Sequence, residues 1–403
     1  MNLLAPFSAL RNGRFARLYI AQTISQLGDA FTWVGLALLA FELAGAGASL
    51  VLGVALTLRV SAFVLLAPLA GVLADRLDRR TTLALTHFGR AVVISLMPLI
   101  TQVWQVYVLV FALNVLTAFF TPTNQATVPL VMGQEDADQA FALSSATTEL
   151  FSIVGPGLAG VLATLTGGRS LFYLDAATFI VAGLLILSLP SLRPSQAGES
   201  QASRWQDIRD GTARLWRDPP IRFAMLMELI AALTGALVLV VTVVRIKGEL
   251  GLGDAEYGWV MALYGLGATT GALAVGAVGQ RIPRTLFIFV GALLSVLAVL
   301  PADALTFAPL MMLWLVAGVG QNWVNLPVKT LLAEHTEEAA QGRVYGAHFA
   351  WSHLWWAFAY PLTSLLSAQV SYTFLYGGLI AFLGLLLATL SFYRSVPKAI
   401  FQR

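Results

Sequence analysis

Long apolar stretches, separated by short polar segments, run through almost the whole chain. A helix needs about 20 apolar residues to cross the hydrocarbon core of a bilayer. Twelve stretches reach that length, and they cover residues 15–43, 50–74, 81–101, 104–131, 139–166, 170–190, 220–246, 255–280, 284–302, 305–333, 342–369 and 371–394. The pattern therefore predicts an all-α membrane protein with twelve transmembrane helices.

Glycine, proline and arginine residues recur along this pattern at one fixed separation. Gly53 and Gly258 lie 205 residues apart, and the same separation links Gly71 to Gly276, Arg76 to Arg281, Arg79 to Arg284, Pro122 to Pro327, and Pro156 to Pro361. A long self-similar period indicates two copies of one architecture. Each period contains six spans, an even number, so both copies have the same orientation, as in transporters built from parallel repeats. We therefore predict six-helix bundles over 1–190 and 220–403.

The stretch 191–219 joins the two predicted bundles. It begins rich in Ser, Gln and Gly and continues with Trp205, Ile208 and Trp216 spaced among arginines. Apolar residues at helical spacing among basic ones indicate an amphipathic helix on the membrane surface. A disordered tether is the alternative interpretation.

The distribution of basic residues predicts the orientation. Nineteen of the 24 Lys and Arg residues fall on the side of the N-terminus, whereas the opposite side carries Arg169, Arg245 and Lys247. Cytoplasmic loops carry an excess of Lys and Arg. We therefore expect both termini to be cytoplasmic, in a multi-pass protein of the plasma (inner) membrane. The acidic loop 134–138 is an exception, but acidic residues weigh little in this rule.

Composition excludes several classes of protein. The chain is 58% hydrophobic and 11% charged, whereas soluble proteins carry about 25% charged residues. Cysteine is absent, which excludes disulfides, thiolate metal sites and cysteine nucleophiles. The four histidines lack metal-ligand spacing, and the sequence contains neither a nucleophile–base set nor a phosphate-binding loop. We therefore expect no enzyme, metal, cofactor or nucleic acid partner.

The loop between the second and third spans carries the most specific motif. It reads Gly71-Val72-Leu73-Ala74-Asp75-Arg76-Leu77-Asp78-Arg79-Arg80, which resembles the G-x-L-a-D-R-x-G-R-R signature of the major facilitator superfamily. Twelve spans, a central linker and a degenerate second copy from Gly276 to Arg284 extend the resemblance over the whole chain. Asp78 replaces the usual glycine of the signature, and Gln280 stands where the second copy would have the aspartate.

Several further segments resemble the exporter branch that includes macrolide, multidrug and siderophore efflux proteins. They are Asn12-Gly13-Arg14-Phe15, Gly28-Asp29, Ala118 to Pro122, and Tyr173-Leu174-Asp175-Ala176. Gly155-Pro156 with Gly160 resembles the helix-kink element of drug antiporters, although any flexible transmembrane helix can carry Gly and Pro. Residues 105–131 contain no Arg or Lys, so proton relay cannot use the arginine that many such antiporters carry in span 4.

The resemblance implies that the loop motif is a cytoplasmic gate. Gly71 allows two helices to approach closely. Asp75 is an anion that can pair with an arginine or a helix N-terminus, and Arg76, Arg79 and Arg80 can bridge to carboxylates in one conformation and release them in another. Topology signalling by a basic loop is the alternative.

Ionisable residues within the spans are candidates for coupling, because charge is costly in lipid. Asp29 lies roughly 22 Å along its span from Arg14, and Arg59 lies roughly 13 Å along the next span from Leu50. These depths sum to about one membrane thickness, so we predict an Asp29–Arg59 interaction, either a static pair or a protonation and substrate switch. Arg90 is interpreted as a helix anchor without a transport role.

Two glutamates are further candidates for proton coupling. Glu149 and Glu228 lie within spans 5 and 7, and burial of a carboxyl group suits proton exchange near neutral pH. The resemblance implies that spans 1 and 5 are neighbours, and the repeat extends this to spans 7 and 11, so a contact of Glu228 with His348 or His353 is expected. A helix-packing hydrogen bond is the competing interpretation.

Aromatic and amide side chains indicate where cargo would bind. Aromatic walls with a few amides suit bulky amphipathic or cationic molecules. The candidates for lining a cavity are Arg59, Asn124, Asn322, Trp323, Asn325, Trp351, His353 and Trp355. Interfacial tryptophan belts are the alternative for the aromatic residues, and Trp356 is expected to face lipid.

We therefore expect a major facilitator exporter that rocks two bundles between inward- and outward-open states. Its expected cargo is a bulky amphipathic drug, secondary metabolite or siderophore, exchanged for protons through Asp29, Glu149 and Glu228. A lysophospholipid or lipid flippase is the alternative in the same superfamily, and a non-transporting membrane sensor is the alternative from another class. Small-molecule or lipid-like cargo, protons and membrane lipids are the expected partners of a monomer.

Overall fold

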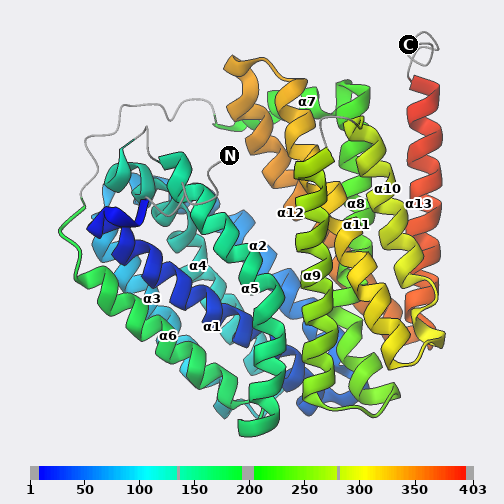
Figure 1. Cartoon of the computed structure of the whole chain (residues 1–403), viewed down its shortest axis with the longest axis horizontal. Coiled ribbons are helices and arrows are strands. Elements are labelled where there is room, and N and C mark those ends of the chain that lie inside the picture. The colour runs from blue at the N-terminus through cyan, green and yellow to red at the C-terminus, as the bar shows by residue number, and fades with distance from the viewer. Residues whose placement is uncertain (1–8, 134–136, 193–203, 279–281, 396–403) are drawn as a thin grey trace. The chain divides into compact units, whose positions relative to one another are not determined.

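The computed structural model is helical nearly throughout the residues it describes, which are 9–133, 137–192, 204–278 and 282–395. Figure 1 shows the order of the helices along the chain. Their bounds are α1 Gly13–Ala44, α2 Ala48–Arg76, α3 Arg79–Leu96, α4 Val103–Met132, α5 Ala137–Thr166, α6 Ser170–Leu187, α7 Arg204–Arg217, α8 Pro219–Val243, α9 Asp254–Val278, α10 Arg284–Val299, α11 Phe307–Glu334, α12 Glu338–Gln369 and α13 Thr373–Ser395.

The helices are long and apolar, which makes the chain a multi-pass membrane protein. Within the described residues, nine segments are long and apolar enough to cross a bilayer, and the first runs through α1 into α2. The predicted spans 139–166 and 342–369 coincide with α5 and α12, which are not among the nine. The count of twelve spans therefore stays a prediction. Helix α7 lies within the predicted linker.

The helix ends follow from local sequence. Asn12 accepts hydrogen bonds from the backbone N–H groups of Arg14 (3.0 Å) and Phe15 (3.2 Å) and so caps the N-terminus of α1. Its amide also donates to Val131 O (3.0 Å) near the end of α4. At the other end of α1, Gly45 has φ of 51°, a conformation that favours glycine. The Asn12-Gly13 segment therefore has a structural task, which is to join the ends of two helices.

The chain divides into two compact units. The first comprises residues 1–45, 58–199 and 253–262, and the second comprises 46–57, 200–252 and 263–403. The segments 46–57 and 253–262 begin α2 and α9, and the two helix starts correspond under the 205-residue repeat. The bounds of these units differ from those of the two repeat copies. The six-helix bundles over 1–190 and 220–403 stay a prediction.

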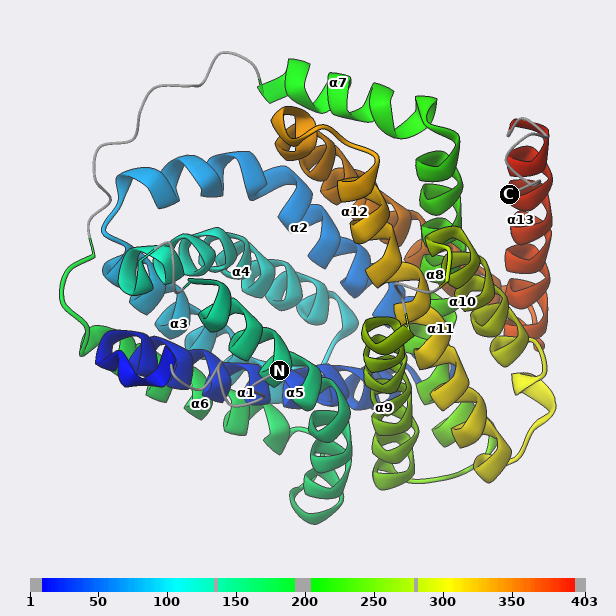
Figure 2. The ribbon, with the colours of Figure 1, turned by 45° about the horizontal axis from the view of Figure 1, so that its top comes forward.

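Helix α6 organises the first unit. It packs along α1 on one side and α3 on the other, and α1 also packs against α5 (Figures 1 and 2). The core beside these helices includes Phe15, Leu18, Leu83 and Ile186, which are at most 1% exposed. Burial of each such side chain stabilises the unit by about 1.5–3 kcal/mol where it replaces contact with water.

Helix α8 is the centre of the second unit. It contacts α10, α11, α12 and α13, and 89% of its most apolar window is buried, the highest share of the nine segments described above. Helix α7 lies crosswise at the start of α8 and packs on α12 (Figure 2). A Cβ on Gly211 of α7 would lie 2.3 Å from Arg343 O, so glycine is required for this close crossing.

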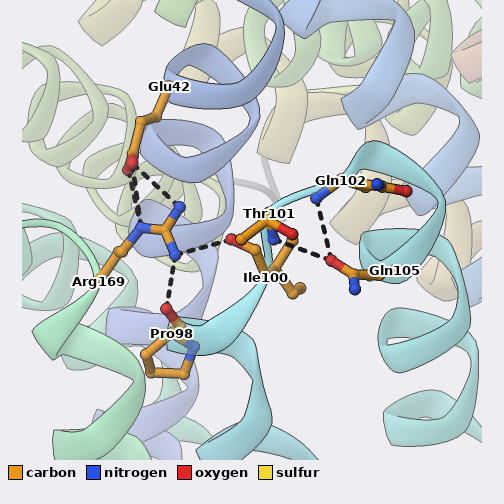
Figure 3. A network of polar contacts seen from close by, with 7 residues as sticks. All are labelled: Glu42, Pro98, Ile100, Thr101, Gln102, Gln105 and Arg169. Atoms are coloured by element: carbon orange, nitrogen blue, oxygen red, sulfur yellow. Dashed lines mark hydrogen bonds and ion pairs between the residues drawn. The ribbon is translucent and has the colours of Figure 1, made fainter.

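Arg169 ties three helix ends together in the first unit. Its Nε and Nη2 atoms contact the carboxylate of Glu42 at the end of α1, the latter at 3.0 Å (Figure 3). Its Nη1 donates to Pro98 O (2.5 Å) and Ile100 O (2.8 Å) after α3. Its Nη1 thus satisfies two backbone carbonyl groups at a helix end, while its Nε and Nη2 pair with the Glu42 carboxylate.

Asp78 makes a different tie at the connection between α2 and α3. Its carboxylate accepts hydrogen bonds from Thr81 Oγ1 (2.8 Å) and from the backbone N–H of Leu192 (2.7 Å), just after α6. Partial burial by itself raises the pKa of the Asp78 carboxyl, but the hydrogen bonds from Thr81 and Leu192 outweigh it, so the pKa is lowered. The position that departs from the glycine of the family signature is therefore occupied by an acceptor that binds the end of α6.

We expect Asp78 to stabilise the fold at neutral pH but not in acid. A lowered pKa in the folded state means that the stabilisation is present above the unfolded pKa near 3.9 and is lost as pH falls through the folded value. Asp78→Asn should lower the unfolding free energy by about 1 kcal/mol at pH 7. Melting temperature in detergent, measured from pH 7 to pH 3, should therefore converge for variant and wild type in acid. A constant difference across this range would contradict the assignment.

Candidate functional site

A buried carboxylate lies inside the first unit, on α6. Asp175 is 0% exposed and accepts hydrogen bonds from Thr32 Oγ1 on α1 (2.5 Å) and from Thr178 Oγ1 (3.0 Å). Burying a carboxylate is costly unless hydrogen bonds and opposite charge compensate it. Asp175 is therefore a candidate for function, and the sequence analysis named it only within a family-like motif.

Gly28 makes room for this carboxylate. A Cβ at Gly28 would lie 2.1 Å from Asp175 Oδ1 and 2.1 Å from Thr178 Oγ1. Any other residue would therefore displace Asp175 or push α1 away from α6. Gly28 leaves space for the Asp175 side chain, and the next residue of α1 is a second acidic residue, Asp29.

Arg90 on α3 supplies the positive charge at this place. It is 2% exposed and lies with its guanidinium over the rings of Phe120 (4.2 Å) and Phe179 (4.4 Å). Its Nη2 is 3.1 Å from His87 Nδ1. Both Asp29 and Asp175 attract it electrostatically. Phe120 belongs to α4, so a cation lies against the very span that contains no Arg or Lys of its own.

Arg59 on α2 is the arginine predicted from the sequence to pair with Asp29, and this pairing stays a prediction. The charges of Arg90 and Arg59 both act on Asp29, and Arg59 holds its guanidinium 4.2 Å from the centre of the Trp33 ring. Cation–π contact stabilises a guanidinium that is removed from water. Asp29, Arg59, Arg90 and Asp175 together are termed the charge cluster below. The cluster lies entirely in the first unit.

The second unit contains one buried acid–base pair. Glu228 on α8 lies 2.9 Å and 3.0 Å, through its two carboxylate oxygens, from His348 Nε2 on α12. The side chains are 7% and 10% exposed. Of the two contacts expected for Glu228, the structure contains the one with His348. His353 instead lies with Nδ1 at 2.8 Å from Phe349 O.

Helix α5 is held against α1 and α9 at the predicted kink motif. A Cβ on Gly155 would lie 2.4 Å from Ala30 Cβ, and one on Gly160 would lie 2.7 Å from Gly258 Cα. The motif glycines therefore allow close helix packing, and Pro156 lies between them within α5. The Glu149 side chain lies outside the described residues, so its role stays a prediction.

The amide and indole groups proposed to line a cavity mostly bond to neighbouring helices. Asn322 Nδ2 donates to Ala268 O (2.6 Å) and Trp323 Nε1 to Gly271 O (3.0 Å), both on α9. Asn124 Nδ2 donates to Gln22 Oε1 (3.4 Å), while its buried Oδ1 has no hydrogen-bond partner among the described residues. Asn325 is half-buried. A cargo role for these residues stays a prediction beside their packing role.

Trp351 and Trp355 lie against helix α7. Their ring centres are 5.2 Å and 6.3 Å from that of Trp216, and Trp351 Nε1 donates to Thr212 Oγ1 (3.3 Å). The expectation that Trp356 faces lipid is wrong, because a Cβ on Gly235 of α8 would lie 2.6 Å from its ring. Helical spacing predicts a shared face but not which neighbour covers it.

The gate motif is described only at its second half. The side chains of Gly71, Asp75 and Arg76 lie outside the described residues. Arg79 Nη1 donates to Ala126 O on α4 (2.6 Å), and Arg80 Nη2 donates to Leu187 O on α6. In the second copy, Arg284 pairs with Glu334 on α11 (3.3 Å), the helix that corresponds to α4. These arginines hold helix ends together, and their gating role stays a prediction.

Sequence reasoning missed Asp175 as a site residue and gave Arg90 no transport role. Both are ionisable residues within apolar helices, and that signal alone would have marked Asp175. Their meeting could not be predicted, because α3 and α6 are far apart in the chain and the charge cluster takes its side chains from four helices.

Comparison with known proteins places the chain in a family. The family model described as Major Facilitator Superfamily matches residues 18–245 and 224–403. The uncharacterized MFS-type transporter YfiS of Bacillus subtilis is 28% identical and covers 82% of this chain and 81% of its own length. The enterobactin exporter EntS of Citrobacter koseri is 28% identical, covering 73% and 71%. The multidrug resistance protein MdtG of Dickeya zeae is 25% identical, covering 69% and 68%.

A solved structure supports the same fold. The crystal structure of the nucleoside transporter NupG matches with a TM-score of 0.74 and 14% sequence identity, covering 94% of this chain and 98% of that one. At this identity the likeness concerns the fold alone.

Proposed function

The chain belongs to the Major Facilitator Superfamily and is a transporter, and on that premise we propose that it exports bulky amphipathic small molecules by proton antiport. The efflux-type relatives EntS and MdtG support export as the direction. The cargo class is a drug, secondary metabolite or siderophore. The transporter alternates access between the two sides of the plasma (inner) membrane, with both termini in the cytoplasm.

The charge cluster is the observation that carries the coupling mechanism. In a medium of low dielectric constant, opposite charges attract strongly even without direct contact. Protonation of Asp29 removes the negative charge that Arg59 and Arg90 attract. Proton binding on α1 is thereby linked to the arginine charges carried by α2 and α3. Asp175 keeps a second acidic group beside Arg90, so that arginine retains a partner when Asp29 is neutral.

The Glu228–His348 pair is a second point at which a proton can bind. While Glu228 is ionised, His348 Nε2 is the donor in the hydrogen bond between α8 and α12, whereas a protonated Glu228 carboxyl can itself donate to Nε2. Under the 205-residue repeat, Glu228 corresponds to Thr23 and Asp29 corresponds to Thr234. Asp29 in the first unit and Glu228 in the second therefore lie at different depths. This asymmetry suits a transporter in which protons and cargo bind at different sites.

Transport by the purified protein in proteoliposomes tests the proposal. An imposed pH gradient should drive a lipophilic cationic dye or a catecholate siderophore against its gradient. Asp29→Asn should abolish gradient-driven movement, and Glu149→Gln and Glu228→Gln should weaken it. Asp210→Asn, an acid-to-amide change on the exposed surface of α7, is the matched control.

Two results would refute the proposal. One is cargo movement that is indifferent to the pH gradient and unchanged by Asp29→Asn. The other is transfer of lysophospholipid between leaflets with no movement of the soluble cargos, which would make the protein a lipid flippase.

A further inference from the structure

A hollow lined by positive charge lies between the ends of α8 and α13. It has a volume of about 360 Å³ and is lined by Arg222, Leu387, Leu390, Ser391 and Arg394. Ligand pockets span about 300–1,000 Å³, so the hollow can hold a small polar group. None of the charge cluster residues contributes to it, and the proposed transport function makes no use of it.

The position of the hollow is that of a lipid headgroup. Arg222 lies in the first turn of α8 and Arg394 in the last turn of α13, so both are at the membrane–water interface. Leu387 and Leu390 of the lining are 59% and 54% exposed. Exposed leucines one and two turns further into an apolar helix face acyl chains in a bilayer, while the arginines at the helix ends face the headgroups.

The packing of the two helices holds the arginines in place. Phe223 of α8 and Phe392 of α13 stack with their ring centres 4.6 Å apart, and these residues directly neighbour the hollow in sequence. The two helices pack against each other. The spacing of the two guanidinium groups therefore depends on a packed core rather than on loops.

Comparison with the first unit shows that the positive charge at this hollow is available. The repeat matches Arg222 to Arg17, and Arg17 Nη1 donates to Ser188 O at the end of α6 (2.7 Å). The hydrogen bond given for Arg222 is a longer one, 3.4 Å to Trp216 O. Within the described part of the chain, no hydrogen bond or ion pair holds the Arg394 side chain.

Neighbouring acidic groups do not neutralise the hollow. Asp218, at the start of α8, accepts from the backbone N–H of Ile221 (3.0 Å) and lies 3.1 Å from His335 Nδ1. Arg214 and Arg217 lie in the last turn of α7 just before it. The surroundings therefore favour an anion.

We propose that this hollow binds the phosphate of an anionic membrane phospholipid, with the acyl chains lying over Leu387 and Leu390. Paired guanidinium groups bind phosphate oxygens through charge-assisted hydrogen bonds. A free phosphate ion would use the same two arginines, but the exposed leucines on the membrane side favour a lipid. The bound lipid fixes the start of α8, the central helix of the second unit, at the membrane surface.

Binding of lipid to the purified full-length protein tests the proposal. Native mass spectrometry would compare phosphatidylglycerol with phosphatidylcholine on wild type, on R222Q/R394Q and on the control R11Q/R14Q. The control removes two exposed arginines near the other end of the chain. Each arginine near a membrane surface contributes roughly fivefold to anionic lipid binding, so the double variant should bind phosphatidylglycerol roughly 30-fold more weakly. The control should bind it as wild type does.

Three outcomes would overturn the proposal. Equal phosphatidylglycerol binding by R222Q/R394Q and wild type would show that the lipid binds elsewhere. An equal loss in R11Q/R14Q would show a general effect of charge. Displacement of the lipid by millimolar inorganic phosphate would show a site for a soluble anion. The melting temperature shows whether R222Q/R394Q is folded. If it is not, the single variants R222Q and R394Q are used instead, and each should lose roughly fivefold in phosphatidylglycerol binding. Cargo transport is not measured, so failure of the antiport proposal leaves this test intact.

Discussion

Arg90→Leu should destabilise the protein by about 3–5 kcal/mol, because removing one partner of a buried pair leaves an uncompensated charge. Arg90 is the cation that both Asp29 and Asp175 attract, and it is 2% exposed. Leucine would fill the space between Phe120 and Phe179 but would leave both acidic groups without their shared counter-charge. Gradient-driven transport should also be lost. Thermal melting in detergent and proteoliposome transport are the measurements.

Two companion variants separate the charge of Arg90 from its shape. Arg90→Lys keeps the charge but loses the planar stacking on Phe120 and Phe179, so it should keep most of the stability. Combining Arg90→Leu with Asp175→Asn removes both charges and should recover part of the loss, as coupled neighbours do in a double-mutant cycle. Arg90→Leu with the melting temperature and transport rate of wild type would show that Arg90 is only a space-filling anchor.

Gly318→Val should cost at least about 1–3 kcal/mol, the range for overpacking a filled core. A Cβ at Gly318 would lie 2.0 Å from Tyr264 O and 2.7 Å from Ala268 N, both backbone atoms of α9. A Cβ at Gly267 of α9 would in turn lie 1.9 Å from Leu315 O. Backbone cannot rotate away as a side chain can, so α9 and α11 must separate. The bonds from Asn322 and Trp323 to α9 would then be lost.

Gly346→Val is the matched control for this substitution. Gly346 lies within α12, is exposed, and a Cβ there would meet nothing within 4 Å. Its replacement should change stability little, since valine is only slightly better than glycine in a helix. Melting temperature and the elution profile of the purified variants report the difference. Equal behaviour of Gly318→Val and Gly346→Val would show that α9 and α11 are not in backbone contact.

The glycines and prolines of the repeat illustrate how far sequence reasoning reaches. Gly160 and Gly258 were predicted to matter for packing or repetition, and they prove to lie against each other, since a Cβ on either would lie within 2.7 Å of the other's Cα. The sequence predicted their role in packing because few residue types allow two helices to approach closely. The sequence could not predict that Gly160 contacts Gly258, because α5 and α9 belong to different copies of the repeat.

The tryptophans of α12 show what helix periodicity cannot predict, which is the neighbouring helix that each face contacts. Trp351 and Trp355 are four residues apart, a spacing that puts both on one helix face, and their ring centres lie 5.2 Å apart. The face is covered by Trp216 from the linker helix α7, and Trp356 packs on α8. Periodicity describes a helix by itself, whereas the neighbour on each face depends on how the helices assemble.

The sequence by itself determined the class of molecule: helical, membrane-embedded, built from a 205-residue repeat and belonging to the superfamily whose motif it carries. These properties are local, because in lipid every backbone group must bond within its own helix, so apolar length and turn residues are enough to show them. Only the tertiary structure decided which charges meet. Arg90, Asp29 and Asp175 come from three helices, and their attraction depends on packing between segments that no sequence spacing relates.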